Sequence, residues 1–318
     1  MSSTRSKVHP KYKTKYRVTN WASYDRALVR RGDVTLWFAP EAIDTWNARP
    51  TGRRGAQPQF SDMAIETALT LRLIFHLPSR QTEGFVRSIL RLMGLELEAP
   101  DHTTLSRRGR SLVIDLRAQL TSGPLHLLVD SSGLSAFGEG EWAAAKHGGR
   151  GKRGWRKLHL GVDRSGVIVA QSLTEANADD AATALDLIAT LDGDLASLTA
   201  DGAYDTSLVY EAAVMRGAKV VIPPSTTATL SCKPRSRSSP RDQTISRVKE
   251  VGRRQWRKES GYYRQARAEN AFFRYKTILG DRLRARCEPS RVVEARLACS
   301  ILNRMTALGR PASVAIEA

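Results

Sequence analysis

The order of apolar runs in the second half of the chain constrains its fold most strongly. Three strand-like runs come first, at 125–130 (LHLLVD), 156–163 (RKLHLGVD) and 167–173 (VIVAQSL). The DRSG sequence at 163–166 is typical of the turn in an antiparallel hairpin. Helical and strand patterns then alternate: helix 180–191, strand 196–201, helix 206–216 and strand 218–224. We therefore predict an α/β core in which a three-stranded antiparallel meander is extended by two further strands and their helices.

The segment before this core has helical periodicity. Ser61 is a plausible helix cap, and apolar residues recur every four positions after it, at Ile65, Leu69, Leu73 and Leu77. A turn at 94–100 and a third element from Asp101 predict a helix-turn-helix-like module with Arg107 and Arg108 facing DNA. The alternative is a helical bundle that only supports the rest of the protein. We expect an all-α DNA-binding region over 20–120, after a flexible basic arm at 1–19.

Three acidic residues occur where separate elements could bring them together. Asp130 and Asp201 each end an apolar run, and Glu269 lies in the helical pattern of 264–279. Three ionised carboxylates held close together repel, and a hard divalent cation that accepts oxygen ligands relieves that repulsion. We therefore predict a Mg²⁺ site at these acids. Two such ions can clamp the attacking and leaving oxygens of a displacement at phosphorus.

Other acids and histidines fit ordinary structural roles better. Asp163 lies in a predicted turn, and Asp179 and Asp180 precede a helix, where aspartate is a common cap. His159 alternates within a strand-like run, which favours a structural role over a metal ligand. Glu269 differs from a surface glutamate because Lys276 lies nearly two turns later on the same helix face. An ordinary surface ion pair is the alternative for that pair.

Charge indicates a polyanionic partner. The 318 residues contain 50 Lys and Arg against 32 Asp and Glu, a formal net charge of +18. Much of it lies in two basic tracts, 146–157 with Lys152 and Arg153, and 233–258 with Trp256. We expect the tracts to bind DNA phosphates. Trp256 either stacks on an unpaired base or anchors the core.

Location in a membrane or outside the cell is not expected. No run approaches the ~20 apolar residues that span a bilayer, and residues 1–17 are polar, unlike a signal peptide. Cys232, Cys287 and Cys299 are isolated, with no CxxC pair. This pattern favours a reducing cytoplasm and argues against a zinc site or disulfides.

Several motifs together resemble one family. They are VDSSG (129–133), EGEW (139–142), KHGGRGKRGWRKLHLGVD (146–163), TADGAYD (199–205), VIPP (221–224) and the stretch 256–286, preceded by similar upstream segments at 20–38, 80–95 and 100–108. In this order they resemble bacterial insertion-sequence transposases of the IS-five family, a DDE family. The resemblance covers nearly the whole chain. It implies a ribonuclease-H-like catalytic domain over 121–310, with a mobile basic insertion at 225–246 and a tail at 311–318.

The resemblance also implies the site. The acids of the DDE family fall on Asp130, Asp201 and Glu269, which would bind two Mg²⁺, with Mn²⁺ able to substitute. A signature of Tyr, Arg, Glu and Lys matches here at Tyr262, Glu269 and Lys276, but Gln265 stands at the Arg position, flanked by Arg264 and Arg267. Guanidinium and amide groups are not equivalent at a phosphate. The DNA contacts implied or expected are Tyr262, Arg264, Lys276, Trp256, Lys152, Arg153, Arg107 and Arg108.

The implied reaction is hydrolysis at the ends of a mobile element, which leaves a 3′-hydroxyl, followed by attack of that hydroxyl on target DNA. The implied partners are the terminal inverted repeats, the target DNA and further copies of the chain, in the cytoplasm at the nucleoid. Two alternatives stay open. One is a catalytically degenerate transposase that only binds DNA, which Gln265 favours, and the other is a nuclease with a ribonuclease-H-like fold.

Overall fold

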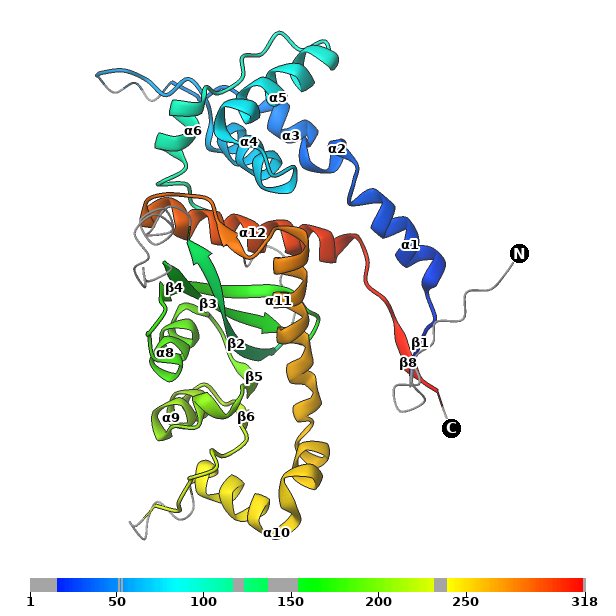
Figure 1. Cartoon of the computed structure of the whole chain (residues 1–318), viewed down its shortest axis with the longest axis vertical. Helices are drawn as coiled ribbons and strands as arrows, with labels where there is room; N and C mark the ends of the chain where they lie inside the picture. The colour runs from blue at the N-terminus through cyan, green and yellow to red at the C-terminus, as the bar shows by residue number, and fades with distance from the viewer. Residues whose placement is uncertain are drawn as a thin grey trace, which may run out of the picture.

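A mixed sheet forms the centre of the computed structural model, which describes residues 16–50, 52, 54–116, 123–136, 154–231 and 239–316. The strands are β2 (Leu125–Ala136), β3 (Trp155–Asp163), β4 (Ile168–Glu175), β5 (Leu195–Thr199), β6 (Lys219–Val221) and the short β7 (Arg282–Leu283). Their order is β4-β3-β2-β5-β6, with β7 beside β2 (Figure 1). The β2–β3 and β3–β4 pairs are antiparallel, whereas β5 and β6 extend the sheet in parallel. This confirms the predicted meander and its extension.

The β3–β4 turn forms as the DRSG sequence predicts. The carboxylate of Asp163 is buried and accepts hydrogen bonds from the Ser165 hydroxyl and from the Val167 N–H. Gly166 has a φ of 87°, which glycine adopts without the steric cost that other residues have. Asp163 therefore has the structural role that was predicted for it.

Helices cover both faces of the sheet. On one face lie α8 (Asp180–Thr190) and α9 (Ser207–Met215), and on the other lie α11 (Ala266–Ile278) and α12 (Glu288–Leu308). Successive strand residues point to opposite faces. In β2, Leu127 and Val129 accordingly join the core under α8 and α9, while Leu128 joins the core under α11 and α12. The same alternation directs Asp130 toward α11.

The first third of the chain is helical and packs on α12. Its helices are α1 (Trp21–Arg30), α2 (Val34–Trp37), α3 (Pro40–Asp44), α4 (Asp62–Ile74), α5 (Ser79–Leu92) and α6 (His102–Arg108). The Ser61 hydroxyl caps α4, as predicted, and the Asp101 carboxylate caps α6. Buried residues of these helices share one hydrophobic core with α12. A separate ribbon joins the ends of the described chain, where β1 (Tyr16–Val18) pairs with β8 (Ser313–Ala315).

The region before α11 differs from the sequence prediction. Helix α10 (Pro240–Ser260) begins inside the segment that was expected to be a mobile insertion over 225–246. Ser239 caps it by accepting a hydrogen bond from the Asp242 N–H, and Pro240 occupies its first turn, where proline fits a helix. This Ser-Pro-x-Asp start is a recognisable helix signal. Gly252 has a φ of 79° and interrupts the helix, and Gly261, with a φ of 76°, ends it.

Helix α12 is buried along most of its length. The Asn303 side chain joins it to the sheet, because its Oδ1 accepts from the Ile168 N–H at 2.8 Å and its Nδ2 donates to the Ile168 carbonyl at 2.7 Å. Among the helices that the structure describes, none has the length and apolar character needed to cross a bilayer.

We predict that Asn303→Ala lowers the free energy of unfolding by about 2–4 kcal/mol, because two buried backbone groups lose their partner. Urea denaturation measures this change. The exposed Asn270 on α11 provides a control, and Asn270→Ala should change stability by less than about 0.5 kcal/mol. A loss at Asn303 no larger than at Asn270 would contradict the role of the amide.

Candidate active site

Asp130 lies in the middle of β2, opposite Leu160 of β3. Its carboxylate is partly buried and accepts a hydrogen bond of 2.8 Å from the N–H of Ser131. Burial raises the pKa of this carboxyl to about 6, and the negative charges of Asp201 and Glu269 contribute to the increase. Asp130 therefore lies within the electrostatic reach of both other acids of the predicted site.

Asp201 reaches the same level of the sheet from the neighbouring strand. In the parallel β2–β5 pair, Leu128 is opposite Thr199, so Asp130 and Asp201 each follow a paired residue by two positions. The Asp201 carboxylate caps the short 3-10 helix η3 (Gly202–Tyr204) and accepts from the Ala203 N–H at 2.9 Å. This hydrogen bond fixes the carboxylate at the end of β5.

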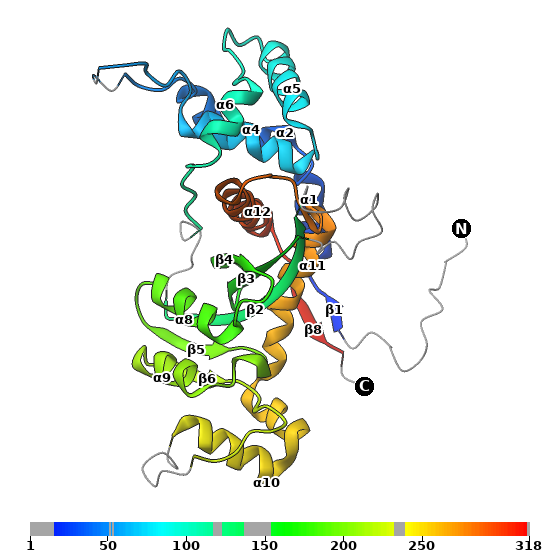
Figure 2. The ribbon, with the colours of Figure 1, turned by 60° about the vertical axis from the view of Figure 1, so that its left-hand side comes forward.

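Glu269 approaches from α11, which runs beside β2 in both ribbon views (Figures 1 and 2). The Lys276 ammonium, seven residues later on the same helix face, donates to the Ser132 hydroxyl at 2.7 Å. Ser132 and Asp130 lie on the same side of β2, since they are two residues apart. The helix face that carries Glu269 and Lys276 is thereby directed at the strand that carries Asp130. Glu269 itself is exposed, in the first turn of α11.

Tyr262 lies in the same neighbourhood. It begins the short 3-10 helix η5 (Tyr262–Gln265), between α10 and α11. Burial raises the pKa of its hydroxyl, and the charges of Asp201, Glu269 and Asp130 raise it further. The ring packs against Trp256 with a centroid distance of 6.1 Å. The structure thus gathers Tyr262 and the three predicted acids around one region.

The acids have the right chemistry for a divalent cation, but they do not form a closed ligand set. Carboxylate oxygens are the preferred ligands of Mg²⁺, and a carboxyl whose pKa is raised by like charges gains from a cation beside it. In the described part of the chain, no group of three His, Cys, Asp or Glu side chains stands close enough to hold a metal. Asp130 and Asp201 come from neighbouring strands of the sheet, whereas Glu269 comes from the exposed start of a helix.

Gln265, at the position where the resembled family has arginine, points into the protein. Its side chain is buried, and its Nε2 donates a hydrogen bond of 2.8 Å to the carbonyl of Val129, next to Asp130. Its Oε1 is buried with no hydrogen-bond partner among the described residues. Arg264 and Arg267, which flank it, are exposed instead. Gln265 therefore supports the backbone of β2 and supplies no charge there.

The other predicted DNA contacts lie in different surroundings. Trp256 is buried, which fits its alternative as a core anchor. Arg108 donates to the Phe60 carbonyl and to the Asp62 carboxylate, whereas Arg107 is exposed. Arg264 is exposed and lies over the ring of Tyr263. Lys152 and Arg153 lie outside the described residues.

A second polar cluster, which the sequence analysis did not assign, lies behind Asp130 on the opposite face of the sheet. Asp179 is the cap of α8, as predicted, but the Asp180 carboxylate accepts from the Lys157 ammonium at 2.6 Å and lies 3.5 Å from Nδ1 of His159. Burial alone would raise the pKa of Asp180, but Lys157, Ser131 and His159 lower it overall. The charge of Asp180 also raises the pKa of Asp130.

The sequence carried a signal for this cluster. Lys157 and His159 alternate with Leu158 and Leu160, which join the core under α11 and α12. Lys157 and His159 therefore face α8, where Asp180 begins the helix. A strand with the pattern Lys-x-His, followed by a helix that begins with acidic residues, predicts an ionic cluster between the strand and the helix.

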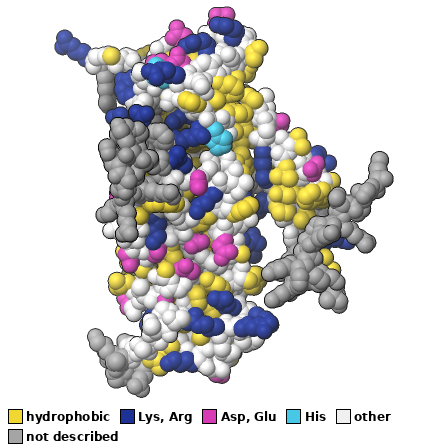
Figure 3. Space-filling model, in the orientation of Figure 1, with side chains coloured by type: hydrophobic (Ala, Val, Ile, Leu, Met, Phe, Trp, Pro, Cys, Tyr) yellow, Lys and Arg dark blue, Asp and Glu magenta, His cyan; other side chains and the backbone are white. Residues whose placement is uncertain are grey.

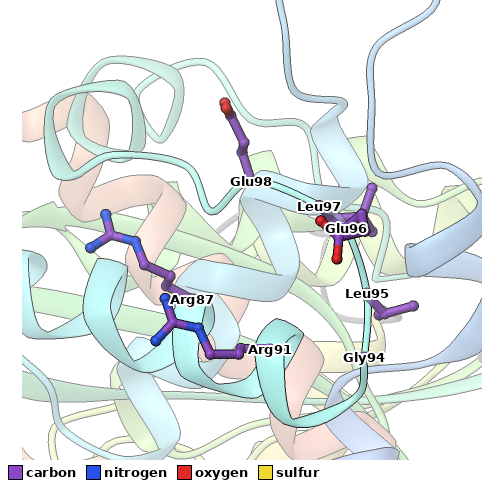
Figure 4. A pocket seen from close by; sticks show the side chains of 7 residues that line it. All are labelled: Arg87, Arg91, Gly94, Leu95, Glu96, Leu97 and Glu98. Atoms are coloured by element: carbon purple, nitrogen blue, oxygen red, sulfur yellow. The ribbon is translucent and has the colours of Figure 1, made fainter.

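The side chains on one face of the molecule separate by charge. Acidic side chains gather where α11 passes the sheet, and Lys and Arg side chains lie above and below them (Figure 3). A concave site of about 390 Å³ lies apart from these acids, at the end of α5 (Figure 4). It is lined by Arg87, Arg91 and residues 94–98. Arg87 is paired with Glu83 at 2.6 Å.

Comparisons with known proteins identify the family of the chain. Two family profiles, both described as "Transposase DDE domain", match residues 29–139 and residues 121–304. A cryo-EM structure of a piggyBac transposase synaptic complex with hairpin DNA is similar over 88% of this chain and 76% of that chain, at 10% identity and a TM-score of 0.37. Because the second profile alone spans more than half of the sequence, the chain belongs to the DDE transposases, enzymes that cleave DNA and transfer its strands.

Proposed function

We propose that this transposase belongs to the IS-five type and cuts DNA at the ends of an insertion sequence with Asp130, Asp201 and Glu269. The observation that carries this proposal is the parallel β2–β5 register, which sets Asp130 and Asp201 at one level of the sheet, together with the Lys276–Ser132 hydrogen bond, which directs the Glu269 face of α11 at β2. Two neighbouring strands and one helix supply these acids. A ribonuclease-H-like core, with acids on adjacent strands and on a following helix, fits this arrangement.

Each residue has a separate task in the proposed reaction. Asp130 and Asp201 form the fixed part of the ligand set, and Glu269 completes it from α11. When bound, Mg²⁺ or Mn²⁺ supplies a Lewis acid that stabilises charge on phosphoryl oxygens and lowers the pKa of a bound water. Lys276, an exposed cation near Ser132, orients a phosphate of the DNA strand. Tyr262 closes the side of the site that faces Asp201.

Parts of the protein outside the three acids also bind the DNA substrate. We infer that the helical region over 20–120 contacts the terminal inverted repeats, with Arg107 as an exposed contact on α6. Arg264, in η5 just before α11, faces solvent and is a second exposed contact. The acting form is an oligomer of this chain on DNA at the nucleoid, because joining two ends of one element requires both to be held at once.

A protein that only binds DNA is the second candidate, and Gln265 is the observation that favours it. A buried amide stands where the resembled family carries a guanidinium, so one phosphate contact is lost. The three acids are all present, however, and they are the carboxylate ligands that the proposed reaction requires. We therefore give the catalytic function first place.

We predict that Asp130→Asn, Asp201→Asn and Glu269→Gln each reduce Mg²⁺-dependent nicking of a supercoiled plasmid that carries the element ends by more than about 100-fold. Each change removes one anionic ligand. Asp186→Asn, at an exposed acid on α8, is the matched control and should retain activity. Equal nicking by the parent and Asp130→Asn, or by neither, defeats the assignment of the acids.

The Asp130 carboxylate should also lower the stability of the folded protein at pH values where it is ionised. Its pKa is raised in the folded protein from 3.8 to about 6, so folding favours its protonated form. The penalty is absent below the unfolded pKa, grows as pH rises, and is complete above the folded pKa. We predict that Asp130→Asn raises Tm at roughly pH 8 and has little effect at roughly pH 4.

Thermal unfolding of the metal-free protein at both pH values measures this effect. Asp163→Asn is the contrasting variant, because Asp163 accepts hydrogen bonds in its turn and its replacement should lower Tm. A Tm increase for Asp130→Asn that is equal at both pH values would show that the charge of Asp130 is not its source.

A further inference from the structure

A groove beside the first turn of α11 contains arginine side chains from three separate segments of the chain. It has a volume of about 790 Å³ and lies between the β3–β4 turn, the start of α11 and the segment that follows α12. Its lining residues are Arg164, Ser165, Val167, Arg267, Thr306, Ala307 and Gly309 to Ser313. None of them is acidic. We call this site the arginine groove.

The positive charge of the arginine groove is not neutralised within the described chain. Arg164, Arg267 and Arg310 are exposed, and none forms an ion pair with a described Asp or Glu. Arg164 lies 3.3 Å from Nε2 of His126, a contact that brings no negative charge. The one carboxylate nearby in sequence, Asp163, is buried in its own turn. Three guanidinium groups therefore present their N–H donors to solvent in one concave site.

Two further arginines support the far wall. Arg31 donates to the Gly309 carbonyl at 3.2 Å, and Arg274 donates to the Thr306 hydroxyl at 2.8 Å. Burial lowers the pKa of Arg274, and the charges of Arg31 and Arg310 lower it further. Like charges thus converge on the segment 306–310, an arrangement that is unfavourable until an anion binds. Nε of Arg31 is also buried without a partner in the described structure.

The arginine groove begins beside the first turn of α11, the helix that carries Glu269. Arg264, in η5, precedes Arg267 by three residues, and burial together with the charges of Arg164 and Arg264 lowers the pKa of His126, which contacts Arg164. Arg267 and Glu269 are two residues apart, so their side chains point to different sides of α11. A phosphodiester chain in the groove would pass around the start of this helix toward Asp130.

We propose that the arginine groove binds the phosphate backbone of duplex DNA beside the cleavage point. This rests on the proposed function, which makes DNA the substrate. Planar guanidinium groups match phosphate oxygens, and exposed arginines from three segments suit consecutive phosphates of a chain better than one small anion. The groove reads no sequence, because backbone contacts set position and not base identity.

The test compares two triple variants that each remove three positive charges. The first replaces Arg164, Arg267 and Arg310 with Gln. The control replaces Lys219, Arg286 and Arg296 with Gln, three exposed cations outside the arginine groove and outside the helical region over 20–120. Binding of a fluorescein-labelled DNA duplex is followed by anisotropy across a series of NaCl concentrations. Circular dichroism and Tm establish that both variants are folded.

We expect the groove variant to bind DNA more weakly and to reduce the slope of log K against log salt by about 2.7, since each lost phosphate contact removes roughly 0.9. The control should change the slope by less than about 1.

Equal losses in both variants would overturn the proposal, because only net charge would then matter. Full inhibition of parent binding by millimolar inorganic phosphate would also overturn it, by indicating a site for a single small anion. Capture of anionic vesicles that depends on the three arginines, with DNA binding unchanged, would assign the groove to a lipid surface instead.

A nicking assay separates this proposal from the proposed function. Asp130→Asn should bind the duplex like the parent and fail to cut, whereas the groove variant should cut at low salt and high DNA concentration. Normal cutting by Asp130→Asn removes the catalytic assignment and leaves the groove standing. Parent-like DNA binding by the groove variant removes the groove and leaves the catalytic assignment standing.

Discussion

The parallel pairing of β2 with β5 is the interaction on which the site depends. It aligns Leu128 with Thr199, and two residues later each strand carries an aspartate. The backbone hydrogen bonds of the sheet thereby hold two negative charges at one level, although 71 residues separate them (201 − 130). Repulsion between them is opposed by the whole sheet and both of its cores. Two carboxylates held this close together repel, and the packing of the surrounding sheet offsets that repulsion.

The two faces of the sheet have different polar surroundings near Asp130. Toward α11, Asp130 and Ser132 meet the helix that carries Glu269 and Lys276. Toward α8, Ser131 borders Asp180 and its ion pair with Lys157. The strict alternation of a strand thus places a candidate reaction site on one side and an ionic network on the other, within three consecutive residues.

The elements could be predicted from the sequence because each has a local cause. Strand alternation, the DRSG turn and the Ser61 cap are all visible within a few residues of the printed chain, and the structure has each of them. The convergence of the acids was a weaker inference, since no local pattern states which strands are neighbours. The direction of Gln265 could not be predicted at all. Whether an amide points to solvent or to the Val129 carbonyl depends on how η5 enters the core. The Lys157–Asp180 pair was similarly hidden, because it joins a strand face to a helix start 23 residues away.

Helix α12 sets the distance between the helical region that is proposed to bind DNA and the candidate active site. It packs against α4 on one side and β4 on the other. Asn303 bonds Ile168 of β4, and Arg304 donates to the Leu36 carbonyl of α2. The helical region and the sheet therefore pack against opposite sides of the same buried helix. If the helices bind one stretch of an element end, the number of base pairs between that stretch and the scissile bond is set by the thickness of a single buried helix.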